Sequence, residues 1–178
     1  MKKICISFLI ILILVLSAIG LTADKGYHTE YLRIHVRANS NTETDQNVKH
    51  AVKDAVVELL TPYLTLCDTK EKAEKTILGL KEQIEKVSKA VLEKNGFDYG
   101  ANAQIKTEKF PTRIYNQLTL EEGYYDALIL NLGDAKGDNW WCVVYPPLCF
   151  TGGNGSYAYK SKILEVITDF LSKHREEK

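Results

Sequence analysis

The sequence has no excess of charge of either sign. Its 178 residues include 23 lysines and arginines and 23 aspartates and glutamates, so the formal net charge is zero. Proteins that bind nucleic acid do so through a surplus of basic side chains. We therefore expect no nucleic-acid partner. The length suits about one domain, and a hydrophobic content of 45% is enough for one buried core.

The sequence also lacks the short motifs of common catalytic and metal sites. It contains no H-x-x-x-H, C-x-x-C or G-x-S-x-G pattern. The glycine-rich stretch 151–156 lacks the Lys-Ser/Thr ending of a phosphate-binding loop, and the turn that holds Asp134 and Asp138 lacks the alternating oxygen ligands of a calcium loop. We predict no metal and no cofactor.

The amino terminus has the pattern of an export segment. Lys2 and Lys3 precede an apolar run from Ile4 to Leu16, and Ala18-Ile19-Gly20 supplies small residues for cleavage. The apolar run is also nearly long enough to span a bilayer. We predict that residues 1–22 are a signal peptide or a membrane anchor, through which an uncleaved chain would contact the membrane, and that residues 27–175 form a single exported domain.

Three cysteines follow the export segment, namely Cys67, Cys142 and Cys149. On an extended strand the α-carbons of Cys142 and Cys149 would lie roughly 23 Å apart, whereas a disulfide allows roughly 4.4–6.8 Å. A bond therefore requires the chain to reverse, and Pro146-Pro147 is placed to reverse it. A disulfide and two buried free thiols are both compatible with this spacing.

The hydrophobic periodicity predicts an α+β fold with two or three helices packed on a mainly antiparallel sheet. Alternation predicts a strand over 31–38, and helical spacing of Val48, Val52, Val56, Leu59 and Tyr63 predicts a helix that ends near Pro62. A second helical stripe consists of Ala73, Ile77, Leu80, Ile84, Val87 and Val91, with a cap at Asp68 and Glu71 and a stop at Asn95-Gly96. Strands are predicted over 101–107, 118–120, 125–132 and 140–145, the last two central in the sheet, and a final helix over 163–171.

Three segments are rich in the residue types that dominate binding surfaces. Tyr31, Arg33, His35 and Arg37 form the polar face of the first strand, and residues 110–115 combine aromatic, proline and arginine residues. Residues 137–150 hold both tryptophans, two cysteines and two prolines. Arg, Tyr and Trp contribute a large share of binding energy in protein interfaces. The alternative for the polar face of the first strand is an exposed sheet face without a binding role. The alternative for residues 110–115 is a loop that fills the core with Phe110.

Several of these strings together resemble the stage II sporulation protein R family of endospore-forming bacteria. They are Tyr31 to Ser40, Asp45-Gln46 with Lys49, Phe110 to Arg113, Gly137 to Cys142 and Pro146 to Phe150, and they cover residues 27–150 in the family's order. The resemblance implies a forespore protein exported into the septal intermembrane space, secreted or anchored at its amino terminus. There it would activate a membrane-embedded aspartic protease of the mother cell, which cleaves a sigma-factor precursor. On this interpretation the chain is no enzyme.

We predict that the partner-binding residues are those of the three segments and of the matching strings. They are Tyr31, Arg33, His35, Arg37, Asn39, Asp45, Gln46, Phe110, Arg113, Tyr115, Asp138, Asn139, Trp140 and Trp141. One alternative is a secreted cell-wall or thiol hydrolase that uses Cys142 or Cys149 with His35. Cys142 lies within an apolar strand and not at a helix start, which favours a structural cysteine. The other alternative is a structural protein of the septum.

Overall fold

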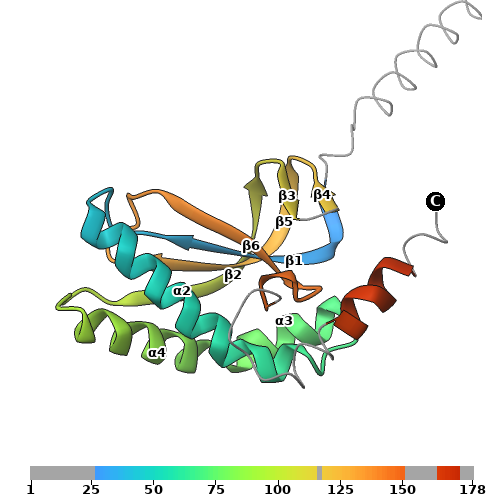
Figure 1. Ribbon diagram of the computed structural model, residues 1–178, viewed down its shortest axis with the longest axis horizontal. Coiled ribbons are helices and arrows are strands. Elements are labelled where there is room, and N and C mark those ends of the chain that lie inside the picture. Colours follow the sequence, from blue (N-terminus) through green and yellow to red (C-terminus); the bar gives the residue numbers. More distant parts are fainter. Residues whose placement is uncertain (1–26, 116–117, 151–163, 173–178) are drawn as a thin grey trace, which may run out of the picture.

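The computed structural model describes residues 27–115, 118–150 and 164–172 (Figure 1). The predicted export segment lies outside these residues. The elements are β1 (Tyr27–Arg37), α2 (Glu43–Leu64), α3 (Lys70–Gly79), α4 (Lys81–Lys94), β2 (Ala101–Phe110), β3 (Arg113–Tyr115), β4 (Leu118–Leu120), β5 (Gly123–Leu132), β6 (Asn139–Tyr145) and η1 (Leu148–Phe150), followed by a helical segment at 164–172.

A four-stranded sheet with the order β2-β5-β1-β6 forms the centre of the fold. The β2–β5 and β1–β6 pairs are antiparallel, and the central β1–β5 pair is parallel. Helices α2, α3 and α4 all lie on one side of this sheet (Figure 1). The prediction of an α+β fold with a mainly antiparallel sheet is confirmed. The β3–β4 hairpin is a separate two-stranded sheet.

The prediction that β6 is central is wrong, because β6 lies at the edge of the sheet and β1 takes the central place. Val143, Val144 and Tyr145 are nevertheless buried. Other elements cover this edge strand: the Tyr145 ring contacts Phe170 of the helical segment 164–172, with a centroid separation of 5.9 Å, and η1 packs on β6. An apolar strand can therefore lie at an edge when elements outside the sheet bury it.

Helix α2 buries a stripe of five residues at a strict spacing of four, Val48, Val52, Val56, Leu60 and Leu64. The predicted stripe is wrong at its end, since Tyr63 is 42% exposed and Leu59 is only partly buried. The helix also continues through Pro62 to Leu64. A proline in the last turn removes only one hydrogen bond, and burial of Leu60 and Leu64 offsets that loss.

The second helical stripe is divided between α3 and α4, which meet at Leu80. Ala73, Ile77, Leu80 and Ile84 are buried as predicted, but Ser88 and Leu92 replace Val87 and Val91 as the buried positions. The cap of α3 is Thr69, whose side chain accepts a hydrogen bond from the Lys72 amide, and not Asp68. The predicted stop holds, because Gly96 adopts a φ of +83° after α4.

The chain reverses after β6 through Pro146-Pro147, and the Tyr145–Pro146 peptide bond is cis. This reversal brings the α-carbons of Cys142 and Cys149 to 5.9 Å, and the two residues form a disulfide. Cys67 is a buried free thiol. No helix in the ranges that the structure describes is long and apolar enough to cross a membrane.

Candidate functional site: the open face of the sheet

The sheet has one face that the helices do not cover, which we call the open face. Leu32, Ile34 and Val36 of β1 belong to the buried helix side, so the alternate residues Arg33, His35 and Arg37 lie on the open face. The strand register extends this face into three rows: Asn102–Asn131–Arg37–Asn139, Gln104–Ile129–His35–Trp141 and Lys106–Ala127–Arg33–Val143. Five of the predicted binding residues therefore share this face: Arg33, His35, Arg37, Asn139 and Trp141.

Glu108 is the centre of a charged cluster on the open face. His35 Nδ1 donates to Glu108 Oε2 at 2.9 Å, and Arg37 Nη2 donates to Oε1 at 2.7 Å. Lys106 Nζ lies 2.9 Å from the same Oε1. Burial alone would raise the pKa of Glu108, but hydrogen bonds from these three side chains lower it to about 2. The carboxylate therefore stays ionised and fixes the direction of Arg37.

Arg33 anchors the β3–β4 hairpin over one end of the open face. Its guanidinium carbon lies 4.3 Å from the ring centroid of Phe110 and 4.8 Å from that of Tyr125, and its Nη2 donates to the Tyr115 hydroxyl at 2.9 Å. The side chain is fully buried. Burial lowers the pKa of Arg33, although a guanidinium remains charged at any physiological pH. Phe110 is fully buried as well and packs against Arg33. This agrees with the alternative that Phe110 fills the core.

Trp141 and Arg113 form a contact between an aromatic ring and a cation on the open face. The Arg113 guanidinium carbon lies 4.6 Å from the ring centroid of Trp141 on β6, and the ring centroid of His35 on β1 lies 5.4 Å from that of Trp141. Tyr115 donates to the Trp141 carbonyl at 3.5 Å. Arg113 itself is exposed and Trp141 is half-buried. The β3–β4 hairpin therefore places the Arg113 cation over the ring of Trp141, which comes from β6. Solvent reaches this contact.

Buried polar atoms without a hydrogen-bond partner gather on this same face. In the described ranges they are Arg33 Nε and Nη1, His35 Nε2 and Asn131 Oδ1. The Asn139 side chain lies near His35, but Nε2 forms no hydrogen bond of normal geometry. Each such group costs about 1–3 kcal/mol, and native proteins hold few of them. They lie on the side of the sheet opposite the helices, but each atom is shielded from solvent, and the guanidinium of Arg33 lies against the rings of Phe110 and Tyr125.

A second group of predicted residues forms a framework where the loops meet at one end of the sheet. Asp45 accepts hydrogen bonds from Asn39 Nδ2 at 3.0 Å, from the Ser40 hydroxyl and from the Tyr99 hydroxyl at 2.5 Å. Burial would raise the pKa of Asp45, but the hydrogen bonds from Ser40, Tyr99 and Asn39 lower it overall. This network ties the chain after β1 to the start of α2.

The framework also holds the loop between β5 and β6. Lys49 Nζ donates to Gln46 Oε1 at 2.6 Å and to the Asp138 carbonyl at 3.0 Å. The Asn39 side chain accepts from the Asp134 amide at 2.9 Å. A Cβ at Gly137 would overlap the Ser40 carbonyl oxygen, which is why glycine is needed there. Asn39, Asp45, Gln46 and Asp138 thus have partners inside the domain, and their role in binding stays a prediction.

Two other predicted binding residues lie away from the open face. Trp140 is packed beside α2, where Lys53 Nζ lies 5.4 Å from its ring centroid. Tyr31 is 8% exposed, and its ring lies 5.4 Å from that of Phe170.

Glu108, Lys106 and Asn131 were not predicted, although their alternation along β2 and β5 was a signal that one strand face is polar. Nothing in the sequence pairs them with β1.

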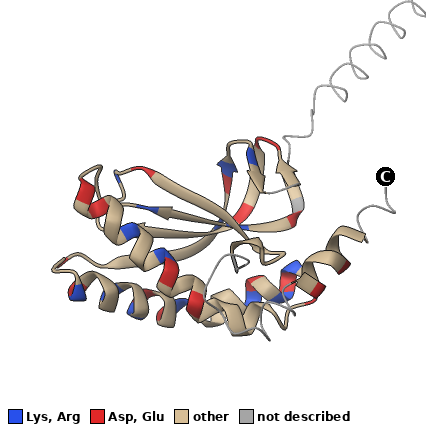
Figure 2. Cartoon of the chain, in the orientation of Figure 1, with Lys and Arg blue, Asp and Glu red and all other residues tan. Residues whose placement is uncertain are grey.

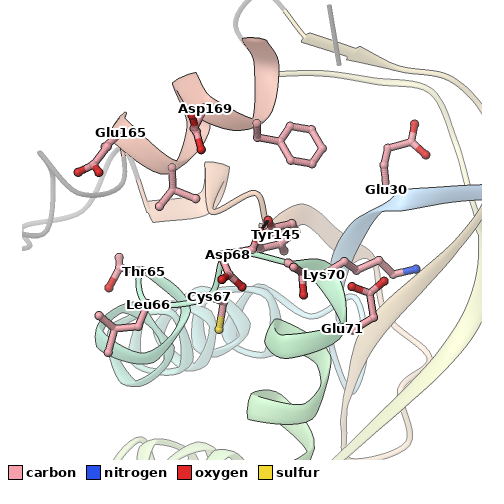
Figure 3. Close-up of a pocket in the computed structure, with 13 residues that line it drawn as sticks. Glu30, Thr65, Leu66, Cys67, Asp68, Lys70, Glu71, Tyr145, Glu165 and Asp169 are labelled. Atoms are coloured by element: carbon pink, nitrogen blue, oxygen red, sulfur yellow. Dashed lines mark hydrogen bonds between the residues drawn. The ribbon is translucent and has the colours of Figure 1, made fainter. Parts of the chain in front are cut away.

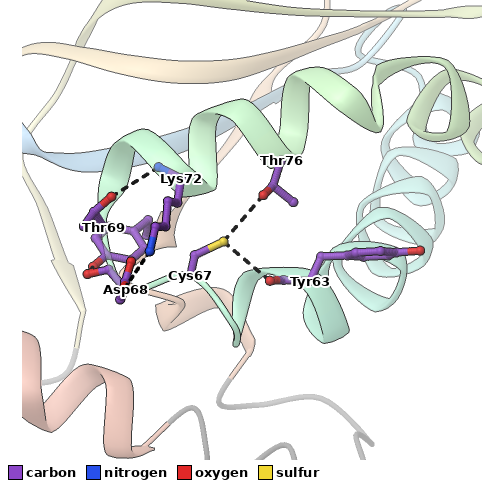
Figure 4. A network of polar contacts seen from close by, with 7 residues as sticks. Tyr63, Cys67, Asp68, Thr69, Lys72 and Thr76 are labelled. Carbon is purple, nitrogen blue, oxygen red and sulfur yellow. Dashed lines mark hydrogen bonds and ion pairs between the residues drawn. The ribbon is translucent and has the colours of Figure 1, made fainter.

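The cysteines do not form a thiol–imidazole pair in the described part of the chain. Cys142 and Cys149 are bonded to each other, and His35 Nδ1 is engaged by Glu108. The Cys67 thiol lies between the Tyr63 carbonyl at 3.5 Å and the Thr76 hydroxyl at 3.6 Å, beside the Asp68–Lys72 ion pair (Figure 4). No group of three metal-ligating side chains occurs among the described residues.

A cavity of about 600 Å³ opens where the α2–α3 loop faces the helical segment 164–172 (Figure 3). Its walls carry the carboxyl groups of Glu30, Asp68, Glu71, Glu165 and Asp169, together with Leu66 and Tyr145. The ammonium group of Lys70, which also lines it, is paired with Asp126. None of the predicted binding residues lines this cavity.

Charged residues are frequent on the helices and scarce on β5 and β6 (Figure 2).

Comparisons with known proteins agree on one family. The family model described as stage II sporulation protein R matches residues 28–154. A protein of Bacillus subtilis (strain 168) named stage II sporulation protein R is 29% identical, over 99% of this chain and 88% of its own length. No solved structure matches this chain.

Proposed function

Because the chain belongs to the stage II sporulation protein R family, we propose that it is an exported signalling protein that activates a membrane-embedded aspartic protease of the mother cell. The activated protease then cleaves a sigma-factor precursor. Residues 1–22 direct the chain out of the forespore into the septal intermembrane space, where it is secreted or held by that segment. The chain itself breaks no bond.

The open face is the observation that carries this proposal. It presents Arg37, Arg113 and Trp141, which are residue types typical of binding hot spots. A catalytic alternative through Cys142 finds no support, since a sulfur in a disulfide is not a nucleophilic thiolate. A surface of arginine and tryptophan side chains suits an activator that works by contact with a partner.

Activation requires that the chain bind the active arrangement of the protease more tightly than the inactive one. A ligand with equal affinity for both states shifts nothing, and a shift from about 1% to about 99% active needs roughly a 10⁴-fold preference. The simplest active arrangement is a protease dimer that the folded domain stabilises from the extracytoplasmic side. The rigid strand positions of Arg37 and Trp141 suit this task, because they lose little conformational entropy on docking.

The test is reconstitution of protease, sigma-factor precursor and the full chain in membranes. We expect the wild-type chain to stimulate precursor cleavage, and the double variant Arg37→Ala, Arg113→Ala to stimulate it at least tenfold less. The matched control is Lys89→Ala on the exposed side of α4, where Lys89 pairs with Glu93 at 3.6 Å and its side chain is 61% exposed. Cleavage that does not respond to addition of the wild-type chain would refute the proposed function.

A further inference from the structure

The open face carries more positive than negative charge. Its accessible cations are Arg37, Lys106 and Arg113, and Glu108 is the carboxylate that Arg37 and Lys106 contact. Arg33 lies on the same side of the sheet but is fully buried. His35 does not add a charge near neutral pH, because burial lowers its pKa despite the adjacent Glu108 carboxylate. Three accessible cations therefore accompany Glu108. After Glu108 has paired with Arg37 and Lys106, Arg113 is the accessible cation that has no ion pair among the described residues.

Arg113 is the most available of these cations. Its Nη1 donates only to the Thr112 carbonyl at 3.3 Å, and its guanidinium stacks on Trp141. Within the described residues Arg113 forms no ion pair. A guanidinium fixed over an aromatic ring presents its donors in a plane that matches a carboxylate. Arg37 and Lys106 have side chains that are 25% and 41% exposed, so a bound group could reach them as well.

From this arrangement we propose that the open face binds an acidic peptide segment of its protein partner. A carboxylate of the segment pairs with Arg113, and a neighbouring apolar residue packs on Trp141. The amide side chains of Asn131, Asn139 and Gln104 lie in the adjoining rows and can bond to the segment's backbone. This inference rests on the proposed function, since it gives the chemistry of the surface that the protease would present.

An anionic membrane surface is the competing source of negative charge, and the geometry disfavours it. Binding to lipid headgroups uses clusters of about 4–8 protruding lysines and arginines. On the open face the reachable cations are Arg37, Lys106 and Arg113, and Glu108 lies among them with a side chain that is 19% exposed. A carboxylate inside the patch would repel a continuous anionic surface, whereas a peptide can place its own carboxylates away from it.

The test measures binding of three synthetic peptides to the full chain in detergent. The peptides have equal length and carry glutamate, glutamine or lysine at the same positions, with leucine and glycine elsewhere. We expect the glutamate peptide to bind at least tenfold more tightly than the glutamine peptide and the lysine peptide not to bind. The indole signal of Trp141 should shift on binding, and added salt should weaken the affinity.

Arg113→Gln is the informative variant because the side chain is exposed and has no role in the core. It should lower affinity for the glutamate peptide at least tenfold with an unchanged free energy of unfolding, whereas Lys89→Gln should stay within twofold of wild type. Equal binding of the three peptides, or no effect of Arg113→Gln, would overturn the inference. So would a preference for phosphatidylglycerol over phosphatidylcholine vesicles that Arg113→Gln abolishes.

The outcomes separate this inference from the proposed function. If the chain stimulates precursor cleavage in membranes but does not discriminate among the peptides, the protease is still the partner and the acidic-segment inference is wrong. If the glutamate peptide binds through Arg113 but the chain never stimulates cleavage, the proposed function is wrong and the surface serves another acidic partner.

Discussion

Replacement of Glu108 by glutamine should destabilise the fold, because three side chains lose the one carboxylate that pairs them. Glutamine keeps the shape of the side chain but cannot hold His35, Arg37 and Lys106 as an ionised group does. The structure lowers the pKa of Glu108 from the ordinary value of 4.5 to about 2. A difference of this size corresponds to about 3 kcal/mol at neutral pH, which partial exposure of the side chain reduces to about 2 kcal/mol.

The pH dependence of this loss follows from its sign. The pKa is lower in the folded than in the unfolded chain, so the contribution is complete above pH 4.5 and is lost as pH falls toward about 2. Glu108→Gln should therefore be less stable than wild type by about 2 kcal/mol at pH 7, and the gap should fall to about half of that at pH 3. Urea unfolding followed by tryptophan fluorescence measures both values.

Glu93→Gln on α4 is the matched control for this prediction. Glu93 pairs with Lys89 at 3.6 Å, but both side chains are about 60% exposed, so its loss should cost less than about 0.5 kcal/mol at any pH. The reasoning about the cluster fails if Glu108→Gln is no less stable than Glu93→Gln at pH 7. A gap that stays constant from pH 7 to pH 3 would show that the carboxylate charge is not what the fold uses.

Further substitutions test the framework, the core and the disulfide. Gly137→Ala should cost about 2–3 kcal/mol in urea unfolding because its Cβ meets backbone, whereas Gly100→Ala, with nothing within 4 Å, should change stability little; equal effects would contradict the close approach. Leu60→Ala should cost about 2–5 kcal/mol, and Leu66→Ala, 78% exposed, less than about 0.5 kcal/mol in the same assay. Replacing both Cys142 and Cys149 by Ser should cost about 2.5 kcal/mol yet retain the proposed activation of precursor cleavage, and complete loss of activity in the folded variant would favour a thiol enzyme.

Local periodicity was sufficient to predict most elements of this fold. The alternation around Arg33 and Arg37 predicted β1, the glycine after Asn95 predicted the end of α4, and the fold class followed from the order of elements. The cap of α3 was misassigned by one residue, because Asp68 and Thr69 are both good capping residues and only the backbone geometry separates them. Such errors stay within a residue or two.

Contacts between distant segments could not be predicted in this way. His35 and Glu108 are 73 positions apart, and only the β2–β5–β1 strand order brings them together. The same order makes β6 an edge strand, and the contacts of Tyr115 with Arg33 and with the Trp141 carbonyl bring Arg113 over Trp141. Strand order depends on the packing of the whole domain. The sequence therefore predicts which residues of β1 and β6 are polar or aromatic, but not that Glu108 and Lys106 of β2 lie beside them.

The strings that resemble the family divide into two physical roles, and this division decides how variants should be interpreted. Asn39, Asp45 and Gly137 hold the loops together, so their replacement should lower stability and activation in parallel. Arg113 supports no core contact, so its replacement should lower activation alone. A loss of activation that follows the loss of stability says nothing about where the proposed protease partner binds. The docking surface can therefore be located only with variants such as Arg113→Gln, for which unfolding and activation are measured on the same protein and are seen to separate.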